Sequence, residues 1–550
     1  MNQVEFDYTK QLTQVVAFFK LLESEAKLDE KKLAKEINHL SRSGRVLARS
    51  QLIQAYRQLA GQHGLKPFSR QLVRKLQAKP VRTISGVTPV TILTKPFPCP
   101  GKCIFCPTDA RMPKSYLPSE PGAQRALRNQ FDPYLQTYNR LLALYQIGHD
   151  VGKVEIIVLG GTWSFYPNDY QLWFIKECFR AMNEFDGQET QSRVLKREEV
   201  ASWNELEQAQ LSNETALSRC VGLVIETRPD YLTVQEAVKL RRLGCTKVQI
   251  GVQSLCDRVL DMNKRGHSVA ETAQAFRILR LVGFKIHAHW MANLYGSSVA
   301  QDKRDYLQLF TDPRFKPDEL KIYPCSLIKS AQLMDYYLAG KWQPYTHLQL
   351  LSILKYVFLH TPAYCRLTRV IRDIPSPDIV VGNKKTNFRQ IVDQALIQEG
   401  KKSVEIRARE IRGQAFDPQT VQLTELDYQT SVSNEYFLQY LTGDHDSANQ
   451  PKLLAFLRLS LPTQEPVVDE LKQTAMIREV HVYGPAAQIG QRDQEKAQHT
   501  GLGTKLIDRA KELAKASGYK KLAVISAVGT REYYRKKGFQ DGALYQFLEL

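Results

Sequence analysis

Apolar positions near the amino terminus repeat at the spacing of an α-helix. Side chains three or four residues apart share one helix face, so such repeats predict helices. The pattern indicates short helices over residues 1–80, with too little apolar surface for a strong independent core. We therefore expect this region to pack against the segment that follows it. The repeating positions are Val15, Phe18, Phe19, Leu21, Leu22, Leu47, Leu52, Ile53 and Tyr56.

From Thr88 onward the pattern changes to short apolar runs separated by stretches of helical periodicity. Strands that alternate with helices form a parallel sheet with right-handed crossovers. The pattern predicts an α/β fold in which residues 81–325 form a partial (β/α)6 barrel, with its chemistry at the carboxyl ends of the strands. The six runs are residues 90–93, 154–159, 221–225, 248–250, 286–291 and 320–323.

The last hundred residues have a separate pattern. Strand-like runs surround one helix, which follows Gly503 and places Leu506, Ile507 and Ala510 on one face. This predicts a carboxyl-terminal domain over residues 451–550 and leaves residues 326–450 as a connecting region. The strand-like runs are residues 453–461, 476–483, 522–528 and 543–548.

Composition restricts the location of the protein. Hydrophobic residues make up 43% of the 550, and no run of 18 apolar residues could span a bilayer. The segment from Met1 to Asp7 lacks the basic and apolar regions of a signal peptide. We expect a cytoplasmic protein with no membrane partner.

The net charge of +19 is concentrated in one part of the chain. Residues 37–108 contain no Asp or Glu but twelve Lys and Arg residues. A segment of this kind attracts the phosphates of a nucleic-acid backbone, whereas the alternative is a solvated basic face without a partner. The length without any carboxylate favours nucleic acid.

Three cysteines lie close together in residues 96–107, which we call the cysteine loop. Cys99, Cys103 and Cys106 are separated by three residues and then two. Three thiolates can hold three irons of a 4Fe-4S cluster and leave the fourth iron open to a small molecule. The alternatives are a zinc site or buried structural thiols, but zinc would require a fourth ligand nearby. The nearest histidines, His63 and His149, are far away in the sequence.

This spacing, with Phe105 before the last cysteine, resembles the cluster loop of radical S-adenosylmethionine enzymes. In that family the open iron chelates the methionyl amine and carboxylate, and reductive cleavage yields a 5'-deoxyadenosyl radical. The resemblance implies that residues after the second strand bind the methionyl amino group. Polar residues at the third and fourth strand ends could reach the ribose or the carboxylate, or serve only in caps and salt bridges. These candidates are Gly160, Gly161, Thr162, Glu226 and Gln253.

Four further segments make the resemblance more specific. Residues 79–82, 225–231, 372–375 and 406–410, in this order, resemble the family of Elongator catalytic subunits, which modify the wobble uridine of tRNA. The resemblance runs from Lys79 to Leu550. Many eukaryotic members have a longer gap between the first two cysteines, so this chain is similar to a bacterial or archaeal form. Whether other Elongator subunits accompany it is left open.

The connecting region contains a candidate zinc site. Cys325, His360 and Cys365 are the candidate ligands, since the last two have a spacing found in structural sites. No fourth ligand is evident. Separate core and surface roles for the three residues are the alternative.

The carboxyl-terminal domain resembles the GNAT acetyltransferases. A glycine-rich turn that opens a helix presents backbone N–H groups to a pyrophosphate. The resemblance implies acetyl-CoA binding, and it makes Tyr533, Tyr534 and Glu479 candidate catalytic residues, with Tyr534 near the thioester sulfur. It also assigns Lys153, although its position at the start of the second strand would place it on the opposite face of the barrel from the cysteine loop. The implied binding residues are Lys153, Glu479, Val480, His481, Val482, Gln498, Gly501, Leu502, Gly503, Thr504 and Tyr534.

The two sites together suggest one reaction. The deoxyadenosyl radical would abstract hydrogen from the acetyl methyl group, and the carbon radical would add to C5 of uridine. Loss of an electron and a proton, then thioester hydrolysis, would give 5-carboxymethyluridine, which the resemblance places at the wobble position in the tRNA anticodon stem-loop. A reductase or ferredoxin would supply electrons. The alternatives are a protein lysine acetyltransferase with a structural cluster and Glu479 as general base, or a tRNA-binding scaffold.

Overall fold

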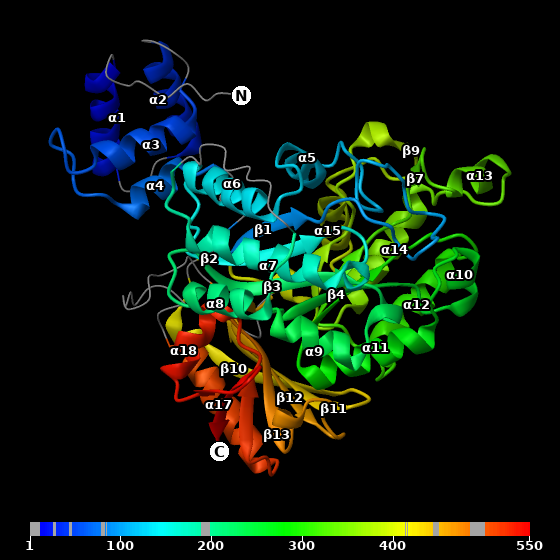
Figure 1. The fold of residues 1–550 in the computed structure, drawn as a ribbon. Coiled ribbons are helices and arrows are strands. Elements are labelled where there is room, and N and C mark those ends of the chain that lie inside the picture. The colour runs from blue at the N-terminus through cyan, green and yellow to red at the C-terminus, as the bar shows by residue number, and fades with distance from the viewer. Residues whose placement is uncertain are drawn as a thin grey trace.

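The computed structural model describes residues 11–25, 29–42, 47–78, 83, 85–188, 199–412, 414, 416–443, 450–483 and 501–550. Figure 1 shows a small helical region at the amino terminus, a central sheet covered by helices, and a second sheet at the carboxyl terminus. In the described part of the chain, no helix is both long and apolar enough to cross a membrane.

The amino-terminal region contains helices α1 (Leu12–Ser24), α2 (Glu30–Arg42), α3 (Arg49–Leu59) and α4 (Arg70–Leu76). These helices bury an apolar cluster of their own, which includes Phe19, Leu52 and Tyr56, and this core is more extensive than the sequence pattern predicts. The region also packs on the central domain, where the guanidinium carbon of Arg57 lies 3.4 Å from the ring centre of Tyr145.

The central sheet is parallel throughout, in the order β1-β2-β3-β4-β5-β6-β8. The predicted six strands are all present, and β8, from the region predicted to be a connection, adds a seventh. Its strands are β1 (Thr88–Leu93), β2 (Lys153–Leu159), β3 (Arg219–Thr227), β4 (Lys247–Gln253), β5 (Lys285–Trp290), β6 (Glu319–Ile322) and β8 (Arg366–Arg369).

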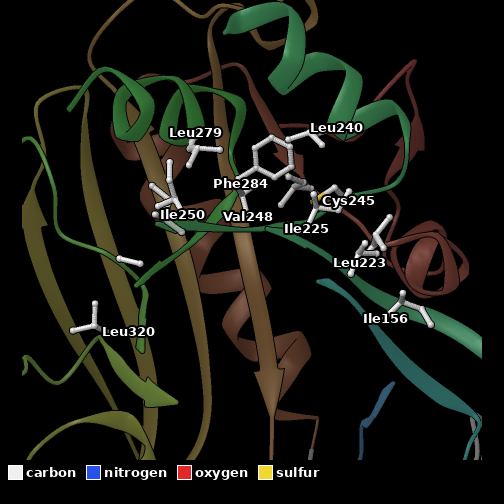
Figure 2. Close-up of a cluster of buried hydrophobic side chains, with 14 of the residues drawn as sticks. Ile156, Leu223, Ile225, Leu240, Cys245, Val248, Ile250, Leu279, Phe284 and Leu320 are labelled. Atoms are coloured by element: carbon white, nitrogen blue, oxygen red, sulfur yellow. The ribbon is translucent and has the colours of Figure 1, made fainter. Parts of the chain in front are cut away.

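Helices pack on the outer face of this sheet. Figure 2 shows Val248 and Ile250 of β4 beneath Leu240 and Leu279, which belong to α9 and α11. Because side chains alternate along a strand, the residues between them face the inside of the barrel. The helices are α5 (Pro121–Arg128), α6 (Pro133–Gln146), α7 (Asn168–Asn183), α8 (Trp203–Asn213), α9 (Val234–Arg242), α10 (Asp257–Met262), α11 (Val269–Val282) and α12 (Val299–Thr311).

The segment after β6 is a mixed region that completes the barrel. The short strands β7 (Leu327–Ile328) and β9 (Ile379–Val381) pair in antiparallel fashion. Four helices surround them and β8: α13 (Leu333–Leu338), α14 (His347–His360), α15 (Phe388–Gln398) and α16 (Ile406–Arg409).

The carboxyl-terminal sheet has the order β10-β11-β12-β13-β14-β16-β15. Its first two strands precede residue 451, so the boundary predicted there divides this sheet, and the connecting region is shorter than expected. The elements are β10 (Gln422–Gln429), β11 (Ser433–Thr442), β12 (Lys452–Pro462), β13 (Thr474–Val482), α17 (Leu502–Ala516), β14 (Lys521–Val524), α18 (Arg531–Arg535), β15 (Gln540–Asp541) and β16 (Gln546–Glu549).

The carboxyl-terminal sheet covers the amino ends of the barrel strands. Arg478 of β13 donates Nη1 to the carbonyl of Phe284, just before β5. A Cβ on Gly529 would lie 2.6 Å from Cβ of Arg219, the first residue of β3. Arg241 of α9 donates to the carbonyls of Ser526 and Leu544. The two sheets are therefore joined at the barrel end opposite the carboxyl ends of the strands.

Candidate functional site

A cavity of about 490 Å³ lies inside the barrel, and we call it the lumen. It reaches Cys99 and Gln253 at the carboxyl ends of the strands, and Glu155 and Lys247 near the amino ends. Its walls are the inward-facing residues of the strands, which recur at every second position.

The cysteine loop forms one end of the lumen, and Cys99, Cys103 and Cys106 all line it. The backbone N–H of Gly101 donates to Cys99 Sγ over 3.4 Å, and Arg265 Nη1 donates to Cys103 Sγ over 3.5 Å. A hydrogen bond with Cys106 contributes most to lowering the pKa of Cys103, and Arg265 and Arg228 lower it further against the effect of burial. The hydrogen bond with Cys103 and burial instead raise the pKa of Cys106. The loop thus favours the thiolate form at Cys103, the form that ligates an iron cluster.

Arg228 leaves room only for a glycine in the loop. A Cβ on Gly101 would lie 2.2 Å from Arg228 Nη1, a buried nitrogen for which the described residues provide no hydrogen-bond acceptor. The other end of this guanidinium donates to both oxygens of Asp230. Arg228 belongs to residues 225–231, the predicted end of the third strand. This strand end therefore packs directly against the cysteine loop.

The residues predicted to bind S-adenosylmethionine lie around the same end of the lumen. Gly161, Thr162, Glu226 and Gln253 line it, and Thr162 Oγ1 is 3.7 Å from Cys99 Sγ. Gly161 has φ 87° with open space where a Cβ would be. Gly160 has φ 132°, and a Cβ there would collide with Thr94 Oγ1. The Gly-Gly pair therefore allows the chain to turn beside the cysteine loop.

Sequence reasoning missed most of the polar groups that line the lumen. His289 Nε2 lies 3.1 Å from Gln249 Oε1, and Lys321 Nζ donates to the same oxygen. Burial lowers the pKa of Lys321 to about 8 and keeps the pKa of His289 well below its usual range. The sequence did contain a signal for these groups, because β4, β5 and β6 alternate polar and apolar residues and the polar set faces the lumen. The missed residues are Lys247, Gln249, His287, His289, Glu319 and Arg366.

The residues predicted to bind acetyl-CoA come together from three elements of the carboxyl-terminal sheet. A Cβ on Gly503, in the first turn of α17, would lie 3.0 Å from Tyr533 Oη and 3.5 Å from a methyl carbon of Val482. Thr504 Oγ1 accepts from Lys537 Nζ at 2.6 Å. The predicted residues Glu479, Val480, His481 and Val482 are on β13, and Gly501, at φ 73°, and Leu502 open α17.

The aromatic pair beside this turn is closely packed. The rings of Tyr533 and Tyr534 have centroids 5.2 Å apart in an edge-to-face arrangement. Tyr534 is buried, and burial raises the pKa of its hydroxyl, which therefore stays protonated as a donor. Gln498, the remaining predicted residue, lies outside the described residues.

Glu479 lies where the two sheets meet. It accepts from Arg458 Nε at 2.9 Å and forms an ion pair with Lys285, the first residue of β5. Burial alone would raise its pKa, but Lys285 and Arg458 outweigh burial and lower the pKa of Glu479. Lys153 begins β2, so it lies at the barrel end that the carboxyl-terminal sheet covers, which removes the objection to its assignment.

The predicted zinc ligands do not form a site. Cys325 packs in an apolar cluster with Ile104, Cys365 is in the main core, and His360 stacks on Tyr356 at the end of α14. Among the residues described, no three Cys, His, Asp or Glu side chains are spaced to hold a single metal ion. The sequence spacing was misleading because Cys325 and Cys365 are buried in separate apolar clusters.

Basic residues gather at the mouth of the lumen beside the cysteine loop. Arg372 donates Nη1 to Ser115 Oγ at 3.0 Å and pairs with Glu120. Lys384 and Lys385 are exposed, and Arg369 pairs with Asp373 near them. The mouth therefore exposes the ammonium groups of Lys384 and Lys385 beside two arginines that are held in ion pairs.

Comparisons with known proteins agree with this geometry. Residues 98–298 match the model of the radical SAM superfamily, and residues 317–398 match the radical SAM C-terminal domain. The tRNA uridine(34) acetyltransferase of Methanocaldococcus infernus is 39% identical over 87% of this chain and 88% of its own. The human Elongator complex protein 3 is 34% identical over 86% of each chain.

A solved structure gives the same result. The Elp3 of Methanocaldococcus infernus, solved without its first 46 residues, superposes with a TM-score of 0.71 at 36% identity. It covers 85% of this chain, and all of that structure is matched. The chain belongs to the radical SAM family of tRNA uridine(34) acetyltransferases and Elongator complex protein 3.

Proposed function

We propose that this chain is a tRNA uridine-modifying enzyme that joins the methyl carbon of acetyl-CoA to C5 of the wobble uridine and yields 5-carboxymethyluridine. The observation that carries the proposal is that one body holds the cysteine loop at one end of the lumen and the Glu479–Tyr534 region next to its other end, where Lys285 pairs with both Glu319 and Glu479. Relatives named tRNA uridine(34) acetyltransferase match along nearly the whole chain, which supports the same reaction class.

Cys99, Cys103 and Cys106 would hold a 4Fe-4S cluster, and Thr162, Glu226 and Gln253 would contact S-adenosylmethionine. The bound pair supplies a 5'-deoxyadenosyl radical that can abstract hydrogen. The residues of the chain orient these groups and exclude water: Arg228 and Arg265 support the loop, and the lumen walls enclose the reacting atoms. Electrons would come from a reductase or ferredoxin, and association with other Elongator subunits stays a prediction.

Acetyl-CoA would bind where β13 meets the amino end of α17. The backbone N–H groups of Leu502 and Gly503 would donate to the pyrophosphate expected at a helix amino terminus, whereas the N–H of Thr504 donates to the Gly501 carbonyl within the first turn. Tyr534, protonated and buried, can donate a hydrogen bond to the thioester sulfur. Lys153 and His481 would complete the site from the barrel and from β13.

The tRNA would bind through phosphate contacts on the basic surfaces. Lys66, Arg70 and Arg74 are exposed on the amino-terminal region, beside Phe68, whose side chain is 49% exposed and available for stacking on a base. Lys384 and Lys385 lie at the mouth of the lumen. An unpaired anticodon base can be splayed from its loop into a pocket at modest cost, and the lumen would receive the uridine.

The lysine acetyltransferase alternative is less well supported. A general base should have a pKa near the working pH. The ion pairs of Glu479 with Lys285 and Arg458 lower its pKa and occupy both carboxylate oxygens. A structural and positioning role for Glu479 agrees better with these contacts.

Acetyl-CoA deuterated at the methyl group tests the proposal. With reconstituted enzyme, S-adenosylmethionine, reductant and tRNA, mass spectrometry should find deuterium in the 5'-deoxyadenosine and 5-carboxymethyluridine in the tRNA. Tyr534→Phe should lower the deuterated yield, whereas Tyr440→Phe, which removes a hydroxyl from another strand of the sheet, should not. Unlabelled 5'-deoxyadenosine together with acetylated protein would overturn the proposal.

A further inference from the structure

The two sites proposed above lie at opposite ends of the barrel. The cysteine loop is at the carboxyl ends of the strands, and the sheet that bears Glu479 packs on the amino ends. A strand such as β4, Lys247–Gln253, spans roughly 20 Å. The acetyl methyl group must therefore cross most of the barrel to meet the radical.

The lumen between the sites is polar. Closed eight-stranded (β/α)8 barrels are filled by branched aliphatic side chains that leave no channel, whereas this sheet has seven strands. Here the inward positions of β4, β5 and β6 carry Gln249, His287, His289, Glu319 and Lys321, and they surround a continuous cavity. Buried charged groups are costly unless they are paired or have a function, so this lining needs an explanation beyond packing.

Ion pairs close the end of the lumen that lies at the amino ends of the strands, which we call its lower end. Glu319 accepts from Lys247 at 3.2 Å and from Lys285 at 2.8 Å. Lys285 also pairs with Glu479 of the carboxyl-terminal sheet. Lys285 thus stands between a residue that lines the lumen and a residue of the proposed acetyl-CoA site.

The contacts allow Lys285 to move without leaving a carboxylate unpaired. Glu319 would keep Lys247, whose Nζ lies 3.2 Å from its Oε2, and His287 Nδ1 lies 3.3 Å from the same oxygen. Glu479 would keep Arg458 at 2.9 Å. An unpaired buried charge is the main cost of breaking an ion pair, and this arrangement avoids it. The long lysine stem can swing while its ammonium stays with one partner.

We propose, resting on the function proposed above, that the lumen is the route by which the thioester arm of acetyl-CoA reaches the radical, and that Lys285 closes its lower end. The arm enters from the Glu479 side, its carbonyl meets the Gln249, His289 and Lys321 side chains, and its methyl approaches the cysteine loop. The thioester stays intact during the passage, so no bond is made or broken there.

Blocking the lumen tests the route. Thr91, in the interior of β1, lines it. Thr91→Trp should leave iron content, S-adenosylmethionine cleavage and acetyl-CoA binding near wild type, but should lower deuterium transfer from methyl-labelled acetyl-CoA at least tenfold. Thr91→Ser is the matched control and should transfer deuterium normally. Undiminished transfer in a folded Thr91→Trp enzyme would overturn the route. No transfer in wild type would instead refute the proposed function.

A labelling experiment gives a second measurement that does not depend on turnover. Thr368 also lines the lumen, 2.8 Å from His287. In Thr368→Cys holoenzyme, the mixed disulfide of CoA with 2-thiopyridine should add CoA to that position and release pyridine-2-thione. Excess acetyl-CoA should reduce this labelling at least tenfold. Leu338→Cys, at a side chain 75% exposed, should label equally with or without acetyl-CoA. Failure to label Thr368→Cys would contradict the route.

Lys285 can be tested in the same assay. Lys285→Met keeps the stem and removes the charge, so it should speed CoA labelling of Thr368→Cys severalfold if Lys285 closes the lumen. Lys316→Met, at a lysine in the loop between α12 and β6 that does not line the lumen, should leave the labelling rate unchanged. An unchanged labelling rate in Lys285→Met would mean that Lys285 only joins the two sheets, and it would refute its role in closing the lumen.

Discussion

Arg478 and Asp318 form a two-pronged buried ion pair between the sheets, with Nη1–Oδ2 at 2.7 Å and Nη2–Oδ1 at 2.8 Å. Asp318 immediately precedes β6, and Arg478 is on β13. Arg280 and Arg458 also pair with Asp318, and Glu435 pairs with Arg478. This network holds the amino ends of the barrel strands against the carboxyl-terminal sheet.

Removing Asp318 should destabilise the protein strongly. Asp318→Asn leaves buried guanidinium groups without their shared carboxylate, and breaking such a pair costs about 3–5 kcal/mol. Denaturant unfolding should show the loss. Asp469→Asn removes the carboxylate of an exposed ion pair with Lys472 and should cost less than about 1 kcal/mol. Equal effects of the two variants would contradict a structural role for the network.

The cysteine loop should lose its iron when one ligand is removed. Cys103→Ala leaves two thiolates, which hold a cluster poorly. Anaerobically reconstituted wild type should contain near four irons per chain, and the variant close to none. Cys256→Ala, at a half-buried thiol outside the loop, should keep the iron. Equal iron content and S-adenosylmethionine cleavage in Cys103→Ala would refute the cluster assignment.

The amino-terminal basic residues should contribute to tRNA affinity through phosphates. Replacing Lys66, Arg70 and Arg74 by Ala should weaken binding and reduce its dependence on salt, since each phosphate contact adds roughly 0.7–0.9 to the slope. Lys75 should be left intact, because its ammonium donates to the Leu22 carbonyl at 2.7 Å and supports the end of α1. An unchanged slope would place the binding surface elsewhere, and the Lys384 and Lys385 pair would be the next to test.

Lys321 should give stability a measurable pH dependence. Its pKa falls from 10.5 to about 8 in the folded protein, chiefly by burial, so between these values the unfolded chain binds more protons. Stability should therefore rise as pH increases from about 8 to 10.5, by on the order of 1–3 kcal/mol from this group. The difference in unfolding free energy between wild type and Lys321→Met should change across this window. A constant difference would contradict the shifted pKa.

The sequence by itself determined the first six strands of the barrel, the cysteine loop and the family, but not β8, β10 or β11. Apolar runs such as Val221 to Ile225 mark buried strands because a strand covered by helices must present apolar side chains to them. The spacing of Cys99, Cys103 and Cys106 is a local property, since the ligands lie on one short loop. The same holds for the glycine-rich turn before α17.

Only the tertiary structure decided which long-range groups meet. Cys325 and Cys365 have the composition of a metal site, yet burial in different apolar clusters separates them. Lys285 and Glu479 are 194 residues apart in the chain, and they pair because the second sheet packs on the amino ends of the barrel strands. Contacts of this kind depend on how two sheets dock, which no local pattern encodes. Residue patterns therefore predict the two chemistries, and the docking of the sheets sets the separation of the two proposed sites.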